Sequence, residues 1–398
     1  MTDPNLAASV QTIDMPEAEA RAIHDRLLTI DTHIDTGPDF ATAALDPGAM
    51  TRAQVDLPGM RIGGLDAGFF IVYTGQGPLD PEGYAAARQA AEEKYCGIER
   101  MLRAYPDQIA LARSADDVEQ IAASGRLVAL IGMENAYPLT DSIADVPIWA
   151  ARGVRYLSMT HFGNNQFGGS SNPVASRGDP ADDPGLTDLG RALIPALNDA
   201  GIMVDLSHVG RRTGLEALAL SRAPVIASHS GARAVFYNPR NLDDEQLQAI
   251  VDVGGVAQMV AFRSYLGNVD PEVTAALEEL RARLGLTGGA AYRTASPVTL
   301  DEFAQERTRI RSEHPDVTLS AFADHVDHAV RVAGIDHVGL SGDFDGGGGV
   351  QGWDSAAETF NVTWELLRRG YTEDDVAKLW SRNVLRVMRA TEATARKA

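Results

Sequence analysis

The chain has 398 residues, 44% of them hydrophobic, and its 55 acidic and 35 basic residues give a formal charge of −20. A surface this acidic repels phosphate backbones, which argues against nucleic acid as a partner. Cys96 is the only cysteine, so neither an intrachain disulfide nor a cysteine-ligated zinc site can form.

Short apolar or β-branched runs alternate with longer segments of helical period, a pattern typical of parallel strands joined by helices. The pattern predicts strands at 27–32, 67–74, 127–134, 154–161, 202–208, 224–229, 255–262 and 337–343. Eight such units predict an α/β protein, a (β/α)8 TIM-type barrel in a single domain over 1–398. An open doubly wound sheet is the alternative, weakened because no dinucleotide glycine fingerprint follows the first strand.

Two regions are longer than the repeat requires. Residues 163–186 are rich in Gly, Ser, Asn and Pro, and we expect a long loop after the fourth strand. Residues 268–332 carry charged helical patterns, more than one crossover helix needs. We therefore expect a helical insertion between the seventh and eighth strands, acting as a lid or an oligomer contact.

Most of the predicted strands end in a side chain that can bind a metal. In a barrel these ends open on one face, where loops build the active site. Side chains two apart in a strand point the same way, so His33 and Asp35 can reach one ion together. Imidazoles and carboxylates are ligands that Zn²⁺ accepts. The set comprises His33, Asp35, Glu134, His161, His208, His229 and Asp343.

Each member alone has a plainer interpretation. A single His-x-Asp is common, His208 or His229 could be a core histidine, and Glu134 could pair with an arginine. The set as a whole predicts a metal site, because structural residues need not choose the same end of successive strands. The remaining histidines carry no such signal: we expect His325 and His328 on a solvated helix face, His337 at the barrel end opposite the site, and His24 and His314 exposed.

The stretches "DTHIDT", "GMEN", "YLSMTHFGNN", "DLSHVG", "PVIASHSGAR", the "RN" of "YNPRN", and "HVGLSGDFDG" resemble the membrane (renal) dipeptidase family of amidohydrolase-like barrels. The resemblance implies a metallodipeptidase with two Zn²⁺ per subunit and a bridging hydroxide nucleophile. It implies that His33 and Asp35 bind one zinc, that His208 and His229 bind the other, and that Glu134 bridges them. It also casts His161 and Arg240 as substrate-binding, and Asp343 as the acid/base with Asp345 as its rival.

Several alternatives stay open. The same binuclear site would serve an N-acyl-amino-acid or lactone hydrolase, and a non-catalytic metal-binding protein is a third option. Arg240 could instead form a surface ion pair with the nearby Asp243 and Asp244. The insertion separates His229 from Asp343 more widely than in the renal enzyme, so the resemblance does not predict the rim of the pocket or the substrate specificity that depends on it.

Location and assembly follow from weaker signals. The first residues show no secretory signal, and no apolar run approaches the ~20 residues of a membrane helix. We therefore expect a cytoplasmic protein, and the resemblance suggests a homodimer acting on a dipeptide substrate.

Overall fold

A computed structural model describes residues 12–37, 39–287, 289–314 and 316–396. The first eleven residues, where we looked for a signal peptide, lie outside the described residues. Eight strands pair in parallel in the order β1-β2-β4-β5-β6-β7-β8-β9. They are β1 (Ile30–Ile34), β2 (Ala67–Tyr73), β4 (Leu127–Glu134), β5 (Val154–Ser158), β6 (Met203–Asp205), β7 (Ile226–Ser230), β8 (Val256–Val260) and β9 (Val338–Ser341).

The sheet closes on itself between its first and last strands. A parallel bridge joins Ile34 to Phe344, and the Asp35 N–H donates to the Phe344 carbonyl at 2.8 Å. The predicted (β/α)8 barrel is therefore confirmed. One strand was not predicted: β3 (Ile109–Leu111) pairs in parallel with the first three residues of β4, and three residues are too few to show a hydrophobic period.

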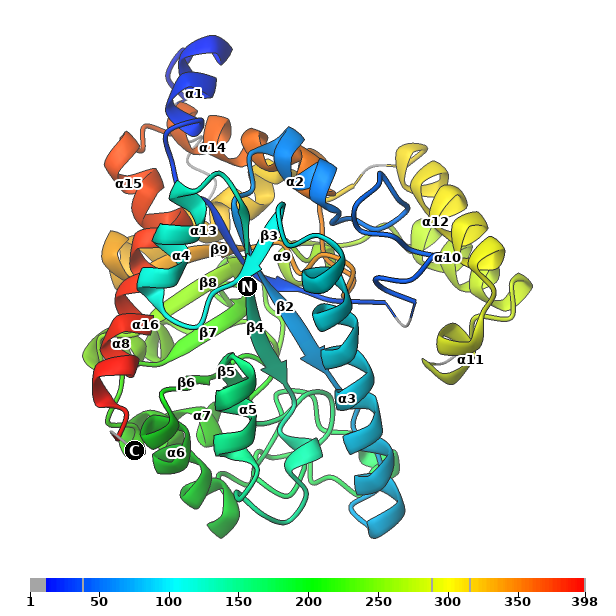
Figure 1. Ribbon diagram of the computed structural model, residues 1–398, viewed down its shortest axis with the longest axis vertical. Coiled ribbons are helices and arrows are strands. Elements are labelled where there is room, and N and C mark those ends of the chain that lie inside the picture. Colours follow the sequence, from blue (N-terminus) through cyan, green and yellow to red (C-terminus); the bar gives the residue numbers. More distant parts are fainter. Residues whose placement is uncertain (1–11, 38, 288, 315, 397–398) are drawn as a thin grey trace.

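Helices surround the barrel and bury its outer face (Figure 1). Gly201 caps the carboxyl end of its helix with a φ of 69°, a left-handed conformation that glycine adopts readily. The capping box between Thr372 and Asp375 is present at the start of α15 (Glu373–Ala377). The other surrounding helices are α2 (Leu57–Gly63), α3 (Pro81–Ala104), α4 (Ala115–Ala123), α5 (Val146–Arg152), α6 (Asp188–Ala200), α7 (Arg211–Leu220), α8 (Asp244–Asp252), α13 (Leu319–Ala333), α14 (Thr359–Arg368) and α16 (Asn383–Thr394).

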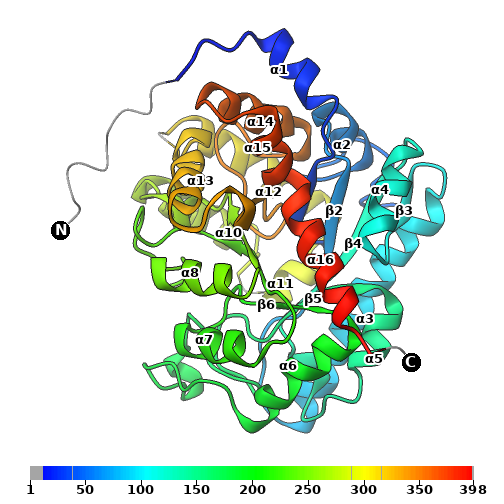
Figure 2. The same ribbon diagram turned by 90° about the vertical axis from the view of Figure 1, so that its left-hand side faces the viewer.

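The ends of the chain add little to the barrel. The short helix α1 (Glu17–His24) packs on α14, at the end of the molecule where Figure 2 shows the two together. Between α15 and α16 the chain forms one π-helical turn, Lys378–Arg382. Trp380, on this turn, is buried and donates to the Thr363 hydroxyl at 2.9 Å.

The region between β8 and β9 holds the extra helices expected there. After α9 (Arg263–Leu266), the helices α10 (Pro271–Arg283), α11 (Gly289–Thr294) and α12 (Pro297–Ser312) lie beside the barrel, on the side away from α16 (Figure 1). They share a small core of their own, which includes Leu277, Leu300 and Phe303. The last helix of the region, α13, instead packs on α8, β8 and β9 and belongs to the barrel layer.

Three histidines are buried where we expected exposure. His325 and His328 are 0% and 5% exposed because α13 turns this face toward the barrel. The His325 Nδ1 accepts from the Ala232 N–H at 2.9 Å, and the His328 Nε2 lies 2.7 Å from an Asp244 oxygen. His24 is 2% exposed and its ring bridges Thr363 and the Gly63 carbonyl. His314 is half-buried, beside Asp270.

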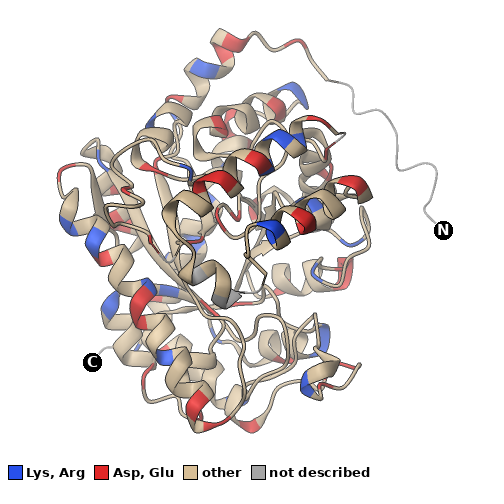
Figure 3. Cartoon of the chain, turned by 90° about the vertical axis from the view of Figure 1, so that its right-hand side faces the viewer, with Lys and Arg blue, Asp and Glu red and all other residues tan. Residues whose placement is uncertain are grey.

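Charged residues of both signs are interspersed along the outer helices (Figure 3). Within the part of the chain that the structure describes, no helix combines the length and the apolar character needed to cross a membrane.

Candidate metal centre

The carboxyl ends of the barrel strands surround one cavity of about 380 Å³. Glu134 is the last residue of β4, His33 and His229 lie within β1 and β7, and His208 lies three residues beyond β6. Asp35, Glu134, His161, His208 and Asp343 all line the cavity wall. The structure thus brings together the side chains that the strand ends predicted, although β5 and β6 stop three residues earlier than expected.

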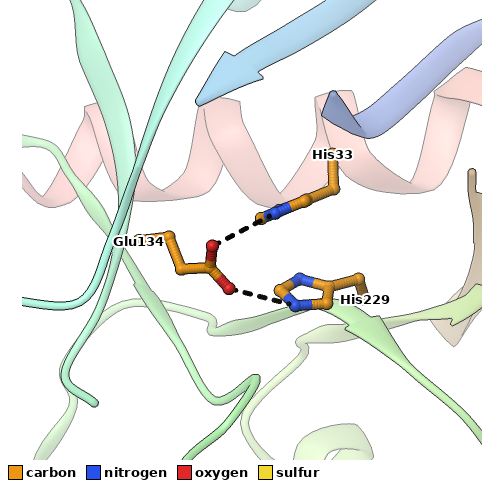
Figure 4. A group of neighbouring side chains, drawn as sticks. All are labelled: His33, Glu134 and His229. Atoms are coloured by element: carbon orange, nitrogen blue, oxygen red, sulfur yellow. Dashed lines mark ion pairs between the residues drawn. The ribbon is translucent and has the colours of Figure 1, made fainter. Parts of the chain in front are cut away.

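The Glu134 carboxylate lies at the centre of the cluster. Its Oε1 is 3.0 Å from the His208 Nε2 and 3.4 Å from the His229 Nε2. Its Oε2 faces the other way and lies 3.5 Å from the His33 Nε2. Figure 4 shows His33 and His229 approaching opposite oxygens of this carboxylate. A carboxylate placed in this way can serve two sites at once.

Two more carboxylates, those of Asp35 and Asp343, lie on the His33 side of the cluster. The His33 Nε2 lies 3.6 Å from an Asp35 oxygen, and ligand atoms of His33, Asp35 and Asp343 all lie within 4.8 Å of one another. Gly346 allows this close approach, since a Cβ there would lie 2.2 Å from Asp343 and 2.3 Å from Asp35. A side chain at this position would push the two carboxylates apart.

Hydrogen bonds from the barrel interior fix the His33 ring. The Tyr156 hydroxyl donates its only proton to the Thr32 carbonyl at 2.9 Å. It can therefore only accept from the His33 Nδ1, 2.8 Å away, so Nδ1 carries a proton and Nε2 is the nitrogen that would present a lone pair to a metal ion. Gly132 leaves room for Tyr156, because a Cβ there would lie 2.3 Å from the phenol ring.

A similar chain of hydrogen bonds fixes His229. The Ser228 hydroxyl donates to Asp205 at 2.6 Å, so it accepts from the His229 Nδ1 at 2.9 Å. The His229 Nε2 is thereby left with its lone pair directed at Glu134. Outer hydrogen bonds of this kind are typical of histidines that bind metal ions.

The third imidazole has no such partner. The His208 Nδ1 is buried without a hydrogen bond from any described residue, and the backbone of His208 has a φ of 66°. Burial lowers the pKa of His208 and of His229 well below the usual value, so both rings are neutral. Neutral imidazoles are the form that binds metal.

The acidic members of the cluster need a positive charge. Burial raises the pKa of Asp343 well above its usual value, and the negative charges of Asp35 and Glu134 nearby raise it further. Burial opposes protonation of His33, but the charge of Glu134 raises its pKa well above the usual value. Buried carboxylates and imidazole nitrogens without a hydrogen-bond partner fit a divalent metal ion, because the ion neutralises the carboxylates and is coordinated by the nitrogens.

Asp345 plays a different part from Asp343. It is exposed, and its carboxylate accepts from the backbone N–H groups of Gln54 at 3.0 Å and Val55 at 3.3 Å. Its own N–H donates to the Gln54 side chain at 2.8 Å. Asp345 therefore ties the loop at 54–55 to the end of β9, whereas the Asp343 carboxylate belongs to the cluster.

His161 and Arg240 lie at the margin of the cluster. The His161 Nε2 is 3.9 Å from Glu134, farther than the other three rings, and its Nδ1 lies 3.5 Å from the Tyr73 hydroxyl. Arg240 is 3% exposed, and among the described residues Asp243 and Asp244 form their ion pairs with other side chains, so the interpretation of Arg240 as a surface ion pair is wrong. Its guanidinium donates to the His229 carbonyl at 2.9 Å and lies 5.2 Å from the Tyr265 ring, which lines the cavity.

This arrangement agrees with what is found among known proteins. The family model of membrane dipeptidases, peptidase family M19, matches residues 17–398. The chain belongs to this family. It is therefore a hydrolase of the metallodipeptidase type, on a barrel that places a buried cluster of side chains able to hold a metal ion at the carboxyl ends of its strands.

Relatives with the family's fold cover most of the chain. The sequence is 30% identical over 347 residues to dipeptidase tcpJ of Claviceps purpurea, covering 86% of this chain and 70% of that one. The probable dipeptidase PvdM from Pseudomonas aeruginosa is 34% identical, with a TM-score of 0.83 over 95% of this chain and 99% of its own. A Rhodobacter sphaeroides metallopeptidase has the same fold, with a TM-score of 0.71 at 23% identity over 92% of this chain and 99% of its own.

Several contributors to the site were not expected from the sequence. Tyr156 and Ser228 lie inside strands and look like ordinary strand residues there. Lys94 lies on a helix and not at a strand end, yet it lines the cavity from α3 and donates to the Thr36 carbonyl. The only sequence signal for its position was its spacing from Ala90 and Gly97, which places all three residues on one face of the helix.

Proposed function

We propose that the protein hydrolyses the peptide bond of dipeptides with two zinc ions. The observation that carries the proposal is the Glu134 carboxylate, whose two oxygens face different imidazoles at 3.0–3.5 Å. His33 and Asp35 would hold one ion on the Oε2 side, His208 and His229 would hold the other on the Oε1 side, and Glu134 would bridge them. Bound zinc supplies a hydroxide nucleophile at neutral pH and polarises the scissile carbonyl.

Asp343 is suited to move a proton during the reaction. Burial raises the pKa of its carboxyl group well above the usual value, which favours a group that takes up a proton and later releases it. It would take the proton of the attacking water and deliver it to the leaving amine. His161, at the edge of the cavity, would donate a hydrogen bond to the oxyanion, a contribution of about 3 kcal/mol in comparable sites.

Arg240 would recognise the free α-carboxylate of the substrate. Its buried Nε has no hydrogen-bond partner among the described residues, so a donor is available. Arg240 does not line the cavity, but its guanidinium lies 5.2 Å from the ring of Tyr265, which does, so a local movement of Arg240 or Tyr265 would be needed for contact with a substrate. An internal residue of a longer peptide has no carboxylate at this point, which would favour dipeptides over longer chains.

The experiment that tests the proposal is hydrolysis of L-Xaa-L-Xaa and L-Xaa-D-Xaa dipeptides with zinc present, before and after dialysis against a chelator. We expect activity that chelation abolishes and added zinc restores. Activity that survives in protein free of metal would overturn the proposal.

The chief alternative keeps the metal site and changes the substrate to an N-acyl amino acid or a lactone. Testing N-acetyl amino acids and lactones beside the dipeptides separates the alternatives, because only a dipeptidase should prefer a free amino terminus. A protein that binds metal without hydrolysing any of these would be the non-catalytic option. The homodimer and the cytoplasmic location stay predictions, for which light scattering and cell fractionation are the measurements.

A further inference from the structure

The cavity wall outside the metal cluster is rich in aromatic side chains, and we call this part of the wall the second region. Only 6% of the chain is aromatic. Yet five of the residues that line the cavity are aromatic, namely Tyr73, Phe162, Phe262, Tyr265 and Tyr292. The catalytic steps proposed above use none of these rings directly. The catalytic steps therefore do not explain why so many aromatic rings line this cavity.

Tyr292 differs from the other four because it comes from the insertion, on α11. Its side chain is 39% exposed and meets Phe303 of α12 edge-to-face, with ring centroids 6.2 Å apart. Phe303 is 4% exposed within the insertion's own core. The core of the insertion thus supports Tyr292 at the wall of the cavity.

The insertion is fastened to the barrel close to the metal cluster. Asp301 of α12 forms an ion pair with Arg52 at 2.8 Å, and Arg52 also pairs with Asp39, four residues after Asp35. Arg263, the first residue of α9, pairs at 2.7 Å with Asp316, which follows α12 in the chain. These ion pairs, one on α12 and one after it, hold the insertion against the barrel.

The rest of the second region is shaped to take an apolar group. Phe262 and Tyr265 stack with centroids 4.2 Å apart, and Phe162 is 42% exposed. On α3, the small residues Ala90 and Gly97 line the same cavity, together with three charged side chains, Glu93, Lys94 and Arg100. Exposed aromatic surface that meets free space in a cavity favours the binding of an apolar group, which displaces water from it.

We propose that the insertion supplies Tyr292 as one wall of a side-chain subsite that selects dipeptides with a large apolar side chain. The inference rests on the proposed dipeptidase function and adds the class of substrate. Small dipeptides such as Ala-Ala would bind to the metal cluster and leave this region filled with water. A phenylalanine side chain would fill it and contact Tyr292.

The test compares kcat/KM for Ala-Ala, Ala-Phe and Phe-Ala in the zinc-loaded wild type and in Tyr292→Ala. We expect the wild type to prefer at least one phenylalanine dipeptide over Ala-Ala by about tenfold or more, the scale on which apolar pockets discriminate. Tyr292→Ala should reduce that ratio by about tenfold, and Tyr292→Phe, which keeps the ring, should preserve it. Tyr237→Ala is the matched control, because Tyr237 is 79% exposed and does not line the cavity.

Hydrolysis of Ala-Ala and the preference ratio report on different claims. Equal rates for all three dipeptides in the wild type, or an unchanged ratio in Tyr292→Ala, would overturn the subsite while leaving the dipeptidase function intact. Failure of the wild type to hydrolyse any of the three would overturn the proposed function, and the subsite with it.

Discussion

The Nε2 atoms of His208 and His229 lie 2.9 Å apart, and both lie within 3.4 Å of the same Glu134 oxygen. Burial lowers the pKa of both rings well below the usual value, so each ring is neutral and carries a single N–H. Since the His229 Nδ1 donates to Ser228, its Nε2 presents a lone pair to His208 and Glu134. A divalent cation at this position would be coordinated by imidazole nitrogen and carboxylate oxygen together.

Tyr156→Phe should weaken metal binding without unfolding the barrel. The ring would still fill the space beside Gly132, but the His33 Nδ1 would lose its acceptor and the imidazole its fixed orientation. We expect the zinc dissociation constant to rise about 10–100-fold, the usual cost of losing such a partner. Competition with a chromophoric chelator measures it.

Tyr84→Phe, on the outer helix α3, is the matched control and should leave zinc affinity unchanged. An affinity in Tyr156→Phe equal to that of the control would show that the Tyr156 hydroxyl does not orient His33.

Substitutions of the two aspartates after β9 should affect different properties, kcat for one and the melting temperature for the other. Asp343→Asn removes the group that moves the proton, so kcat should fall about 100-fold or more. Asp345→Asn weakens the hydrogen bonds to Gln54 and Val55 and should lower the melting temperature, with a smaller effect on kcat. Steady-state kinetics and thermal melts on both variants measure this, and the reverse pattern would make Asp345 the acid/base.

Arg240→Ala should affect free dipeptides more than their C-terminal amides. If the guanidinium binds the α-carboxylate, KM for a free dipeptide should rise about tenfold or more, since a charge-assisted hydrogen bond contributes roughly 1.5–3 kcal/mol. The amide lacks the charge and should change little by comparison. Equal increases for both substrates would remove Arg240 from carboxylate recognition.

His325 should make the protein less stable in acid. Burial lowers its pKa from 6.5 to about 4, so between these values the unfolded chain binds the proton and the folded protein does not. The free energy of unfolding should therefore fall as the pH drops from 6.5 to about 4, by up to about 1.4 kcal/mol per pH unit from this residue. Urea unfolding of wild type and His325→Gln at several pH values measures it, with a shallower slope expected in the variant.

If the two pH profiles run parallel, His325 is not responsible for acid sensitivity. The comparison with the variant matters, because other buried groups of the metal cluster also titrate and contribute to both proteins alike.

The sequence could predict the barrel and the members of the cluster for one physical reason. Parallel strands in a closed sheet present their carboxyl ends on one face, so His33 and Glu134, 101 positions apart in the numbering, had to meet there. Loop conformation was not predictable, and β5 stops three residues before His161.

Burial of polar residues was harder to predict than their position along the chain. His325 and His328 lie one helical turn apart among polar residues, and only the packing of α13 on the barrel shows that this face is buried. Tyr156 occupies a strand position where a core aromatic is ordinary, and its role depends on hydrogen bonds to residues more than a hundred positions away. Such long-range contacts leave no local pattern.

The number of metal ions per chain tests the central claim most directly. Elemental analysis of the purified, zinc-equilibrated protein should find about two ions in the wild type, and Glu134→Gln should lose one or both, because the bridging carboxylate is gone. A wild type that binds no metal, or a Glu134→Gln variant that retains both ions at unchanged affinity, would contradict it.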